Sequence, residues 1–220
     1  MEIKGKILAL VLLLATASAC MKTKLEESYN KQEDKIDSYL KSKMLVKRDS
    51  SWTDTLGFKL DTTALEDGGM KIDTSWTVEK HDTSWTDTLR VIRNGGANRI
   101  VLKEGEGEPL NRNGFVSFYY AGYTFTGSFN ASGLFVTNHQ ATAEQAKWNL
   151  TDADNALYEI NLADEKLIQG LKDGLYGVKA GEECEILFNG KYGFGNEVFG
   201  IIPANSALLY KIWVVGVAND

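Results

Sequence analysis

Cysteine is scarce in this sequence, which has only Cys20 and Cys184 among its 220 residues. If Cys20 carries a lipid, Cys184 has no intramolecular partner, and the fold must depend on its core rather than on disulfides. Cys184 alternates with Ile186 and Phe188 on one face of a strand-like run. No histidine or basic residue adjoins Cys184 to stabilise a thiolate, so we predict a buried small hydrophobe rather than a reactive thiol.

Histidine and clustered positive charge are also scarce. His81 and His139 lie far apart, and neither has a second ligand residue at a useful spacing, so we predict no metal site. The formal net charge is -6, from 30 acidic and 24 basic residues. Beyond the amino terminus no run contains more than two basic residues, which argues against nucleic acid as a partner.

No apolar run is long enough to span a bilayer, which takes about 20 residues. The longest run near the amino terminus is Ile7 to Leu14, between a short basic segment and a small-residue stretch that ends at Cys20. This order is typical of a secretory signal. The last four residues, Ala17-Ser-Ala-Cys20, resemble a bacterial lipobox, although Leu or Val is more common where Ala17 stands. We predict a lipoprotein signal at residues 1–19, with plain secretion as the alternative.

Lipidation of Cys20 would attach the protein to the outer membrane of a bacterial cell envelope. The acidic pair Glu26-Glu27 soon after the anchor hints at surface export, and the sequence leaves the membrane face open. The membrane would then be a partner through the lipid anchor alone.

Residues 20–48 are strongly polar, but Ile36, Tyr39, Leu40 and Met44 recur at helical spacing. This pattern predicts an amphipathic helix within residues 33–44. The helix could pair with a second copy of itself in a homodimer, or it could be a spacer that lifts the rest of the chain off the membrane. We favour the spacer.

Residues 49–94 contain an imperfect repeat, in which SWTDTL begins at Ser51 and again at Ser84, with the related DTSWT from Asp73. Small polar residues alternate with apolar ones, which predicts short strands or hairpins. Because solenoids need three or more full repeats, we interpret the segment as a β extension. Its candidate docking residues are Trp52, Trp76 and Trp85. The turn-forming triplet at residues 94–96 is expected to mark a domain boundary.

Residues 95–220 are expected to form one domain. Strand-like runs occupy residues 99–103, 115–125, 158–162, 183–188 and 207–217. The last run is apolar on both faces, as in a central strand. A single helical stripe, Leu167, Ile168, Leu171 and Leu175, lies within residues 165–176. We predict an α+β fold in which an antiparallel sheet wraps around one short helix.

Four short motifs follow one another along this domain. They are Tyr119-Tyr-Ala-Gly122, the stretch from Leu167 to Glu182, Tyr192-Gly-Phe-Gly195 and Gly200-Ile-Ile-Pro203. Together they resemble the signature of FKBP-type peptidyl-prolyl cis-trans isomerases, in sequence order and in spacing. The resemblance covers a little over half of the chain and implies action on proline-containing segments of exported proteins.

The chemistry that this resemblance implies needs no nucleophile, metal or cofactor. Rotation about the peptide bond before proline is opposed by about 18–20 kcal/mol of amide resonance. An apolar cavity strips water from the amide and disfavours its charge-separated form, and a pocket shaped for the twisted bond binds the transition state preferentially.

The resemblance also implies which residues form the site. Catalytic positions fall on Tyr120, Phe135, Ile168, Phe194 and Tyr210. Substrate-binding positions fall on Tyr158, Leu167, Leu171, Ile201 and Ile202. The main-chain N–H of Ile168 is expected to hold the substrate carbonyl while the aromatic rings wall the proline.

Three positions depart from the family pattern. Leu171 stands where a tryptophan floor is usual, Val136 where a polarising carboxylate is usual, and Phe194 where a tyrosine hydroxyl usually bonds the ligand. A long insertion between Phe135 and Tyr158 carries Trp148 and a short helical segment at residues 141–147. We therefore expect reduced turnover. The alternatives are a non-catalytic chaperone or protein-binding module and, more weakly supported, a purely structural surface lipoprotein.

Overall fold

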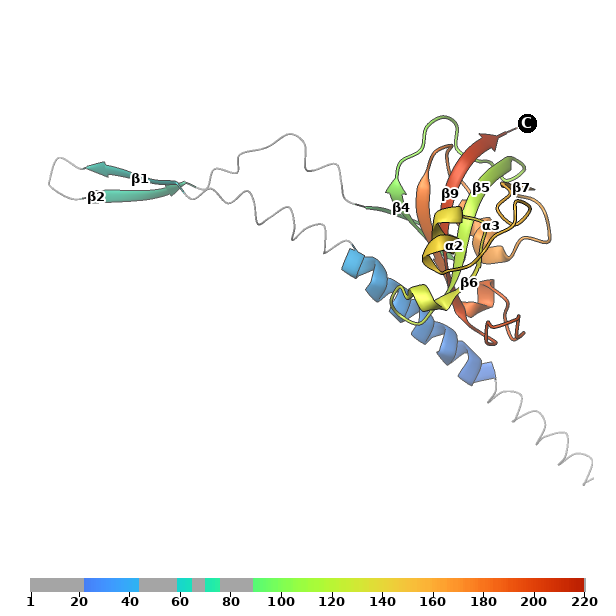
Figure 1. Ribbon diagram of the computed structural model, residues 1–220. Coiled ribbons are helices and arrows are strands. Elements are labelled where there is room, and N and C mark those ends of the chain that lie inside the picture. The colour runs from blue at the N-terminus through green and yellow to red at the C-terminus, as the bar shows by residue number, and fades with distance from the viewer. Residues whose placement is uncertain (1–21, 44–58, 65–69, 76–88, 220) are drawn as a thin grey trace, which may run out of the picture. The chain divides into compact units, whose positions relative to one another are not determined.

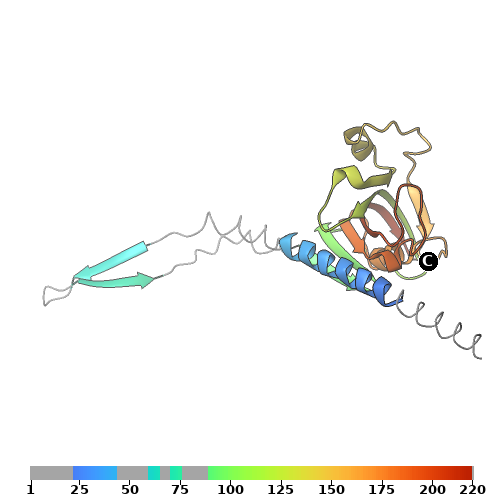
Figure 2. The ribbon, with the colours of Figure 1, turned by 90° about the horizontal axis from the view of Figure 1, so that it is seen from below.

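A computed structural model describes residues 22–43, 59–64, 70–75 and 89–219 (Figures 1 and 2). The chain divides into two compact units, one of residues 1–40 and 90–220 and the other of residues 41–89. In the second unit, β1 (Lys59–Ala64) pairs antiparallel with β2 (Met70–Ser75), in the hairpin form expected of this segment. Cys20, the three repeat tryptophans, the first SWTDTL copy and all of the second copy except Leu89 lie outside the described residues.

The first unit is built on a seven-stranded antiparallel sheet of order β3-β4-β8-β9-β5-β6, with β7 also paired to β5. Its strands are β3 (Arg90–Asn94), β4 (Ala97–Lys103), β5 (Phe115–Phe125), β6 (Leu134–Thr137), β7 (Tyr158–Asn161), β8 (Glu183–Phe188) and β9 (Ala207–Ala218). Short 3-10 turns, η1 (Ala131–Gly133) and η2 (Gly190–Tyr192), precede β6 and follow β8. The predicted α+β class is confirmed, and β5 and β8 begin and end where the apolar alternation placed them.

One boundary differs from the expectation. The turn at residues 94–96 joins β3 to β4, and Asn94 pairs with Ala97 across it. The triplet therefore closes a hairpin inside the sheet and does not separate two domains. Its turn chemistry suits either role, so the sequence alone could not distinguish them.

The inner face of the sheet packs on α3 (Gln169–Leu175), the expected short helix. Two helix glycines bring the backbones together, because a Cβ at Gly170 would lie 2.2 Å from the Phe188 ring and one at Gly174 would lie 2.2 Å from Ile186. The core around them includes Cys184, which is 1% exposed, so the prediction of a buried small hydrophobe is confirmed. Burial raises the pKa of this thiol.

The outer face of the sheet is covered by the N-terminal helix, residues 22–43, drawn in blue against the domain in Figures 1 and 2. Its buried stripe consists of Tyr29, Ile36, Tyr39 and Leu40. The Tyr39 ring meets that of Phe125 edge-on at 5.3 Å, and its hydroxyl donates to Glu185 at 2.9 Å. The helix begins well before residue 33.

The spacer interpretation of this helix is therefore wrong, because residues 22–40 belong to the same compact unit as the sheet. The homodimer interpretation also lacks a free apolar surface on the described part of the helix. The apolar stripe that would pair with a second copy is already covered by the chain's own domain. This packing also explains why β9 is apolar on both faces.

A buried ion pair joins β4 to the residue that precedes β8. The Arg99 Nε lies 3.2 Å from the Glu182 Oε1, with both side chains at most 4% exposed. The Arg99 guanidinium also donates to three carbonyl oxygens at the C-terminal end of α3, those of Gly174, Tyr176 and Gly177. Arg99 thereby satisfies acceptors that the helix leaves without intrahelical partners.

Candidate active site

A cavity of about 720 Å³ opens between the inner face of β5 and β6, the start of α3 and the loop before β9. It brings together all ten residues that the resemblance implied: Tyr120, Phe135, Tyr158, Leu167, Ile168, Leu171, Phe194, Ile201, Ile202 and Tyr210. These residues come from six separate stretches of the chain, so it is the fold, and not closeness in sequence, that brings them together.

The walls of the cavity are interlocked aromatic rings. Tyr120 and Tyr158 meet at 5.8 Å between ring centroids, and both contact Phe118, at 6.0 and 5.5 Å. Across the cavity Phe135 and Tyr210 meet at 5.8 Å. All four contacts are edge-to-face, an arrangement favourable to aromatic pairs. The rings therefore hold one another in place around the cavity.

Gly122 shows why the Tyr-Tyr-Ala-Gly motif ends in glycine. A Cβ at Gly122 would lie 2.7 Å from the Phe135 ring and 2.9 Å from the Tyr210 ring. Any larger residue would push the two rings of the cavity apart.

The walls carry few polar groups, and these groups are available to hydrogen-bond a ligand. Within the described residues, no group hydrogen-bonds the hydroxyls of Tyr120, Tyr158 or Tyr210, and none accepts the main-chain N–H of Ile168. Burial, with the nearby Tyr158 as a smaller cause, raises the pKa of Tyr120. Burial likewise raises the pKa of Tyr210, so both phenols stay protonated at neutral pH. The cavity thus offers hydrogen-bond donors to a ligand carbonyl.

The three departures from the family pattern all face this cavity. Val136 lies on β6 opposite Gly122, and Leu171 is 7% exposed at the floor. Phe194 stacks on Phe199, with the ring centroids 4.7 Å apart and the planes 6° from parallel. The apolar enclosure is therefore intact while the carboxylate and the tyrosine hydroxyl are absent.

The insertion between Phe135 and Tyr158 forms part of the cavity wall and does not fill the cavity. Asn138 fixes its ends, because its Oδ1 accepts the N–H of Tyr120 at 2.6 Å and its Nδ2 donates to the carbonyl of Ala156 at 2.9 Å. The short helix expected here is α2 (Gln140–Gln145). Behind it, Trp148 bonds back to the carbonyl of Ala143 at 2.8 Å and lines the cavity, with 38% of its surface exposed.

Sequence reasoning did not assign several lining residues to the site. They are Phe118, Trp148, Lys166, Phe199 and Gly200. Phe118 had a usable signal, because it shares the inner face of β5 with Tyr120. Among the described residues that line the cavity, Lys166 is the one formally charged side chain, and it is a cation at a different position from Val136, where the resemblance implies a carboxylate.

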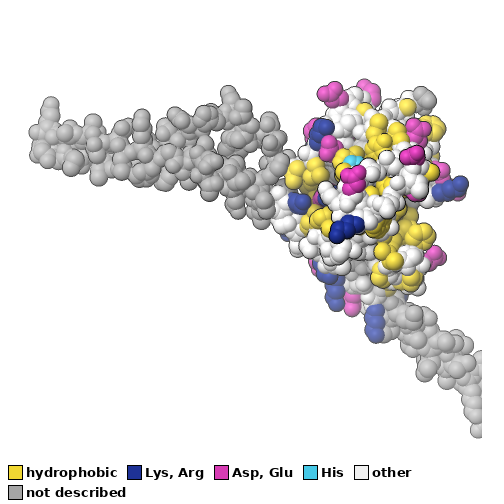
Figure 3. All heavy atoms as spheres, viewed as in Figure 1, with side chains coloured by type: hydrophobic (Ala, Val, Ile, Leu, Met, Phe, Trp, Pro, Cys, Tyr) yellow, Lys and Arg dark blue, Asp and Glu magenta, His cyan; other side chains and the backbone are white. Residues whose placement is uncertain are grey.

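Apolar surface continues outside the cavity. Val198, Phe199 and Ile201 on the loop before β9 are 71%, 60% and 73% exposed. Figure 3 shows hydrophobic side chains gathered over this loop, at the lower right of the domain. Among the described helices, none combines the length and the apolar content needed to cross a membrane. Nor do the described residues include a cluster of three or more metal-ligating side chains.

The chain is similar to a known family and to known proteins. Residues 110–215 match the family of FKBP-type peptidyl-prolyl cis-trans isomerases. FK506-binding protein 1 of Aspergillus oryzae is 23% identical over 117 residues, which are 53% of this chain and 94% of that protein. FK506-binding protein 1A of Aspergillus fumigatus is 26% identical over 94 residues, which are 41% of this chain and 84% of that protein.

The chain is also similar to solved structures. The three FKBP domains of wheat FKBP73 align with a TM-score of 0.46 at 22% identity, over 60% of this chain and 50% of that one. FkpA from Escherichia coli aligns with a TM-score of 0.42 at 14% identity, over 96% of this chain and 70% of that one. The family match spans the strands and the helix that form the cavity, so this chain contains an FKBP-type peptidyl-prolyl cis-trans isomerase domain.

Proposed function

We propose that the protein catalyses cis-trans isomerisation of peptide bonds that precede proline, in segments of exported proteins. The observation that carries the proposal is the apolar cavity, in which the ten residues implied by the resemblance surround a hollow of about 720 Å³. A prolyl ring fits such an enclosure, since ligand pockets of this kind are mostly apolar with a few placed polar groups.

The mechanism is preferential binding of the twisted imide bond. The aromatic walls exclude water, which disfavours the charge-separated resonance form that keeps the bond planar. The unpaired N–H of Ile168 is placed to hold a carbonyl of the substrate, and the phenols of Tyr120 and Tyr210 supply further donors. Because no covalent step occurs, the rate depends on how much better the cavity binds the twisted state than the planar ones.

Turnover is expected to be lower than the apolar enclosure alone would allow. A hydrogen bond lost from the bound state costs about 0.5–1.5 kcal/mol, and one to a charged group about 1.5–3 kcal/mol. The two polar groups missing at Val136 and Phe194 could together lower the rate by roughly 10²–10³-fold. Water exclusion remains, so we expect weak activity and not a complete loss.

Removing one ring of the cavity should test the assignment. With a proline tetrapeptide of sequence Ala-Leu-Pro-Phe in a protease-coupled assay, we expect the unlipidated chain of residues 21–220 to accelerate isomerisation measurably. We expect Phe135→Ala to lower kcat/KM by at least about tenfold, because it opens the wall that faces Tyr210. The longer fragment is needed because the N-terminal helix packs on the domain.

Phe129→Ala is the matched control for this experiment. Phe129 is also a partly exposed ring, but it contacts Tyr123 and Lys211 instead of the cavity. A parent rate equal to the uncatalysed rate would reject the isomerase assignment. Suppression of client aggregation by such a parent would instead support a non-catalytic chaperone, which the exposed Val198, Phe199 and Ile201 favour as the second candidate.

The envelope location is part of the same proposal and rests on the amino-terminal sequence. We expect Cys20→Ala to abolish incorporation of radiolabelled palmitate and to move the protein from the detergent phase to the aqueous phase of a Triton X-114 extraction. A single acyl chain binds membranes only marginally, whereas the multiple chains of a bacterial lipoprotein hold firmly. Cys184→Ala should change neither result, because that thiol is buried in the core. Unchanged labelling of Cys20→Ala would contradict the anchor.

A further inference from the structure

The loop between β8 and β9 supplies a large part of the cavity. Phe194, Phe199, Gly200, Ile201 and Ile202 all line it. Within the loop, Phe199 and Ile202 pair through two backbone hydrogen bonds of 3.1 and 2.9 Å. Much of its outer part is exposed, so its position depends strongly on how its two ends are held.

Those ends meet at Gly190 and Asn205. A Cβ at Gly190 would lie 2.4 Å from the carbonyl carbon of Asn205, so only glycine allows this approach. The N–H of Asn205 bonds the carbonyl of Gly195 at 2.6 Å, and Asn205 itself has a φ of 57°, in the left-handed region. The loop is thus closed by one narrow backbone junction.

The N-terminal helix binds both sides of this junction through one side chain. The Gln32 Oε1 accepts the N–H of Gly190 at 2.8 Å, and the Gln32 Nε2 donates to the carbonyl of Asn205 at 2.7 Å. One turn earlier, the hydroxyl of Tyr29 donates to the Asn205 Oδ1 at 2.7 Å. The same side-chain amide of Asn205 donates to Asn196 within the loop at 3.1 Å.

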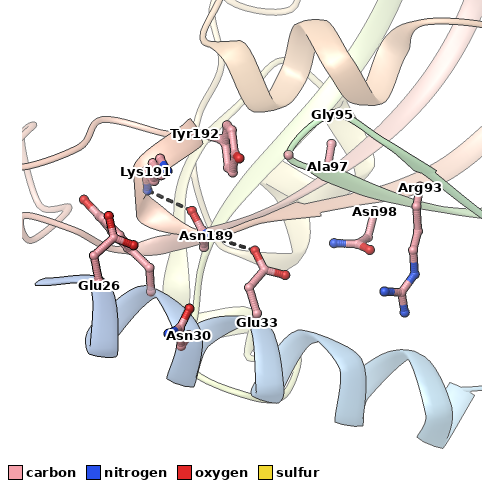
Figure 4. Close-up of a pocket in the computed structure, with 12 residues that line it drawn as sticks. Glu26, Asn30, Glu33, Arg93, Gly95, Ala97, Asn98, Asn189, Lys191 and Tyr192 are labelled. Atoms are coloured by element: carbon pink, nitrogen blue, oxygen red, sulfur yellow. Dashed lines mark hydrogen bonds between the residues drawn. The ribbon is translucent and has the colours of Figure 1, made fainter. Parts of the chain in front are cut away.

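A further contact supports the start of the loop, as Figure 4 shows. The Asn189 Nδ2 donates to Glu33 on the helix at 2.7 Å, while its Oδ1 accepts the N–H of Lys191 and so begins η2. These groups line a polar crevice of about 350 Å³ between the helix and the β3–β4 turn.

Other contacts hold the helix to the domain without touching this loop. Tyr39 donates to Glu185 on β8, and Asp37 accepts from Arg93 on β3 at 2.8 Å. The buried Ile36 lies between the two groups of contacts in sequence and is 0% exposed. The helix therefore has one set of contacts that attaches it to the sheet and a second set, around Tyr29 and Gln32, that engages the cavity loop.

We propose that Gln32 and Tyr29 are positioning residues for the isomerase site, acting through the loop of residues 190–205. This inference rests on the proposed function for its catalytic consequence. The segment that sequence analysis treated as a spacer is then part of the machinery that keeps Phe194, Phe199, Ile201 and Ile202 in the cavity wall.

Hydrogen exchange and kinetics of the chain of residues 21–220 test this proposal. In the double variant Tyr29→Phe/Gln32→Leu, we expect amides of residues 193–205 to exchange at least about tenfold faster, because three hydrogen bonds to the junction are removed. We expect the KM for an Ala-Leu-Pro-Phe peptide to rise several-fold with kcat nearly unchanged, since the loop walls contact the substrate in all its states.

The matched control is Tyr39→Phe/Asp37→Ala, which removes the hydrogen bonds of the helix to Glu185 on β8 and to Arg93 on β3. The control should leave both the loop exchange and KM at parent values, and Tyr29→Phe alone should give a smaller effect if the double variant does not fold. Loop exchange and KM equal to those of the control would overturn the proposal. Exchange is measured without catalysis, so a parent that lacks isomerase activity rejects the proposed function while the exchange result still decides on positioning.

Discussion

Restoring the two missing polar groups should raise isomerase activity substantially: Val136→Asp together with Phe194→Tyr is expected to increase kcat/KM by roughly 10²–10³-fold. The carboxylate would strengthen the polar interactions of the bound state by about 1.5–3 kcal/mol, and the hydroxyl would add about 0.5–1.5 kcal/mol. Each 1.36 kcal/mol of preferential binding is a factor of ten in rate. Both positions already line the cavity, so the groups would be added where substrate binds.

The structure also predicts a cost of this change. A carboxylate at position 136 would sit half-buried among Phe135, Tyr210 and other apolar walls, and leaving it without full hydrogen bonding costs at least about 1–3 kcal/mol. Urea denaturation should therefore show a lower free energy of unfolding for Val136→Asp than for the parent. A gain in rate together with a loss in stability would identify Val136 as a residue that favours the fold over catalysis.

Two single variants separate these effects. Val136→Asn has nearly the same shape as Val136→Asp without the charge, and it should give less than about a tenth of the gain. Phe199→Tyr adds a hydroxyl to the ring stacked on Phe194 and controls for a nonspecific effect of polarity on the loop. If the double variant remained as slow as the parent, the absent carboxylate and hydroxyl would not be what limits turnover, and the non-catalytic alternative would gain support.

Much of the fold follows from short-range pattern. The alternation in Phe115–Phe125 and Glu183–Phe188 predicted β5 and β8 because both strands have one face on a shared core. The run at residues 207–217 was apolar on both faces, and this correctly indicated the central β9. What the pattern did not identify was the element that covers the second face.

That element is the N-terminal helix, and the reason is physical. A stripe of apolar residues indicates that one face of a helix is buried, but it does not indicate which part of the protein covers that face. The decisive contacts here are polar and distant in sequence, such as Gln32 to Gly190 and Tyr39 to Glu185. β6 was missed for a related reason, because four residues beside a turn are too few to establish a period.

The candidate site also contains residues that could be assigned from the sequence and residues that could not. Residues inside the ordered motifs, such as Tyr120 and Ile202, could be assigned by position, and the structure places them in one cavity. Trp148 could not, because it comes from an insertion for which the family pattern offers no equivalent position. Its place at the wall depends on Asn138, whose amide fixes where the insertion leaves and returns to the sheet.

The buried pair of Arg99 and Glu182 should give the largest effect on stability. We expect Arg99→Met to lower the free energy of unfolding by about 3–5 kcal/mol, because it leaves an uncompensated carboxylate in the core. It also leaves the carbonyls of Gly174, Tyr176 and Gly177, at the C-terminal end of α3, without their donor. Glu182→Gln should cost less, about 1–3 kcal/mol, since Arg99 would keep those three acceptors. Lys103→Met, which breaks an exposed pair with Glu183, should cost about 1 kcal/mol at most.

The pH dependence of Arg99→Met distinguishes a lost ion pair from lost packing. Burial already raises the pKa of Glu182, and Arg99 opposes that rise, so removing Arg99 should raise this pKa further. A carboxyl whose pKa is higher in the folded state stabilises the fold at low pH and loses that contribution as pH rises through the folded-state pKa. The stability gap between parent and variant should therefore narrow on going from pH 7 to pH 5, by about 1.4 kcal/mol per pH unit at most. Urea titrations at both values measure this gap, and a gap independent of pH would mean that the cost lies in the stranded carbonyls and the cavity rather than in the charge of Glu182.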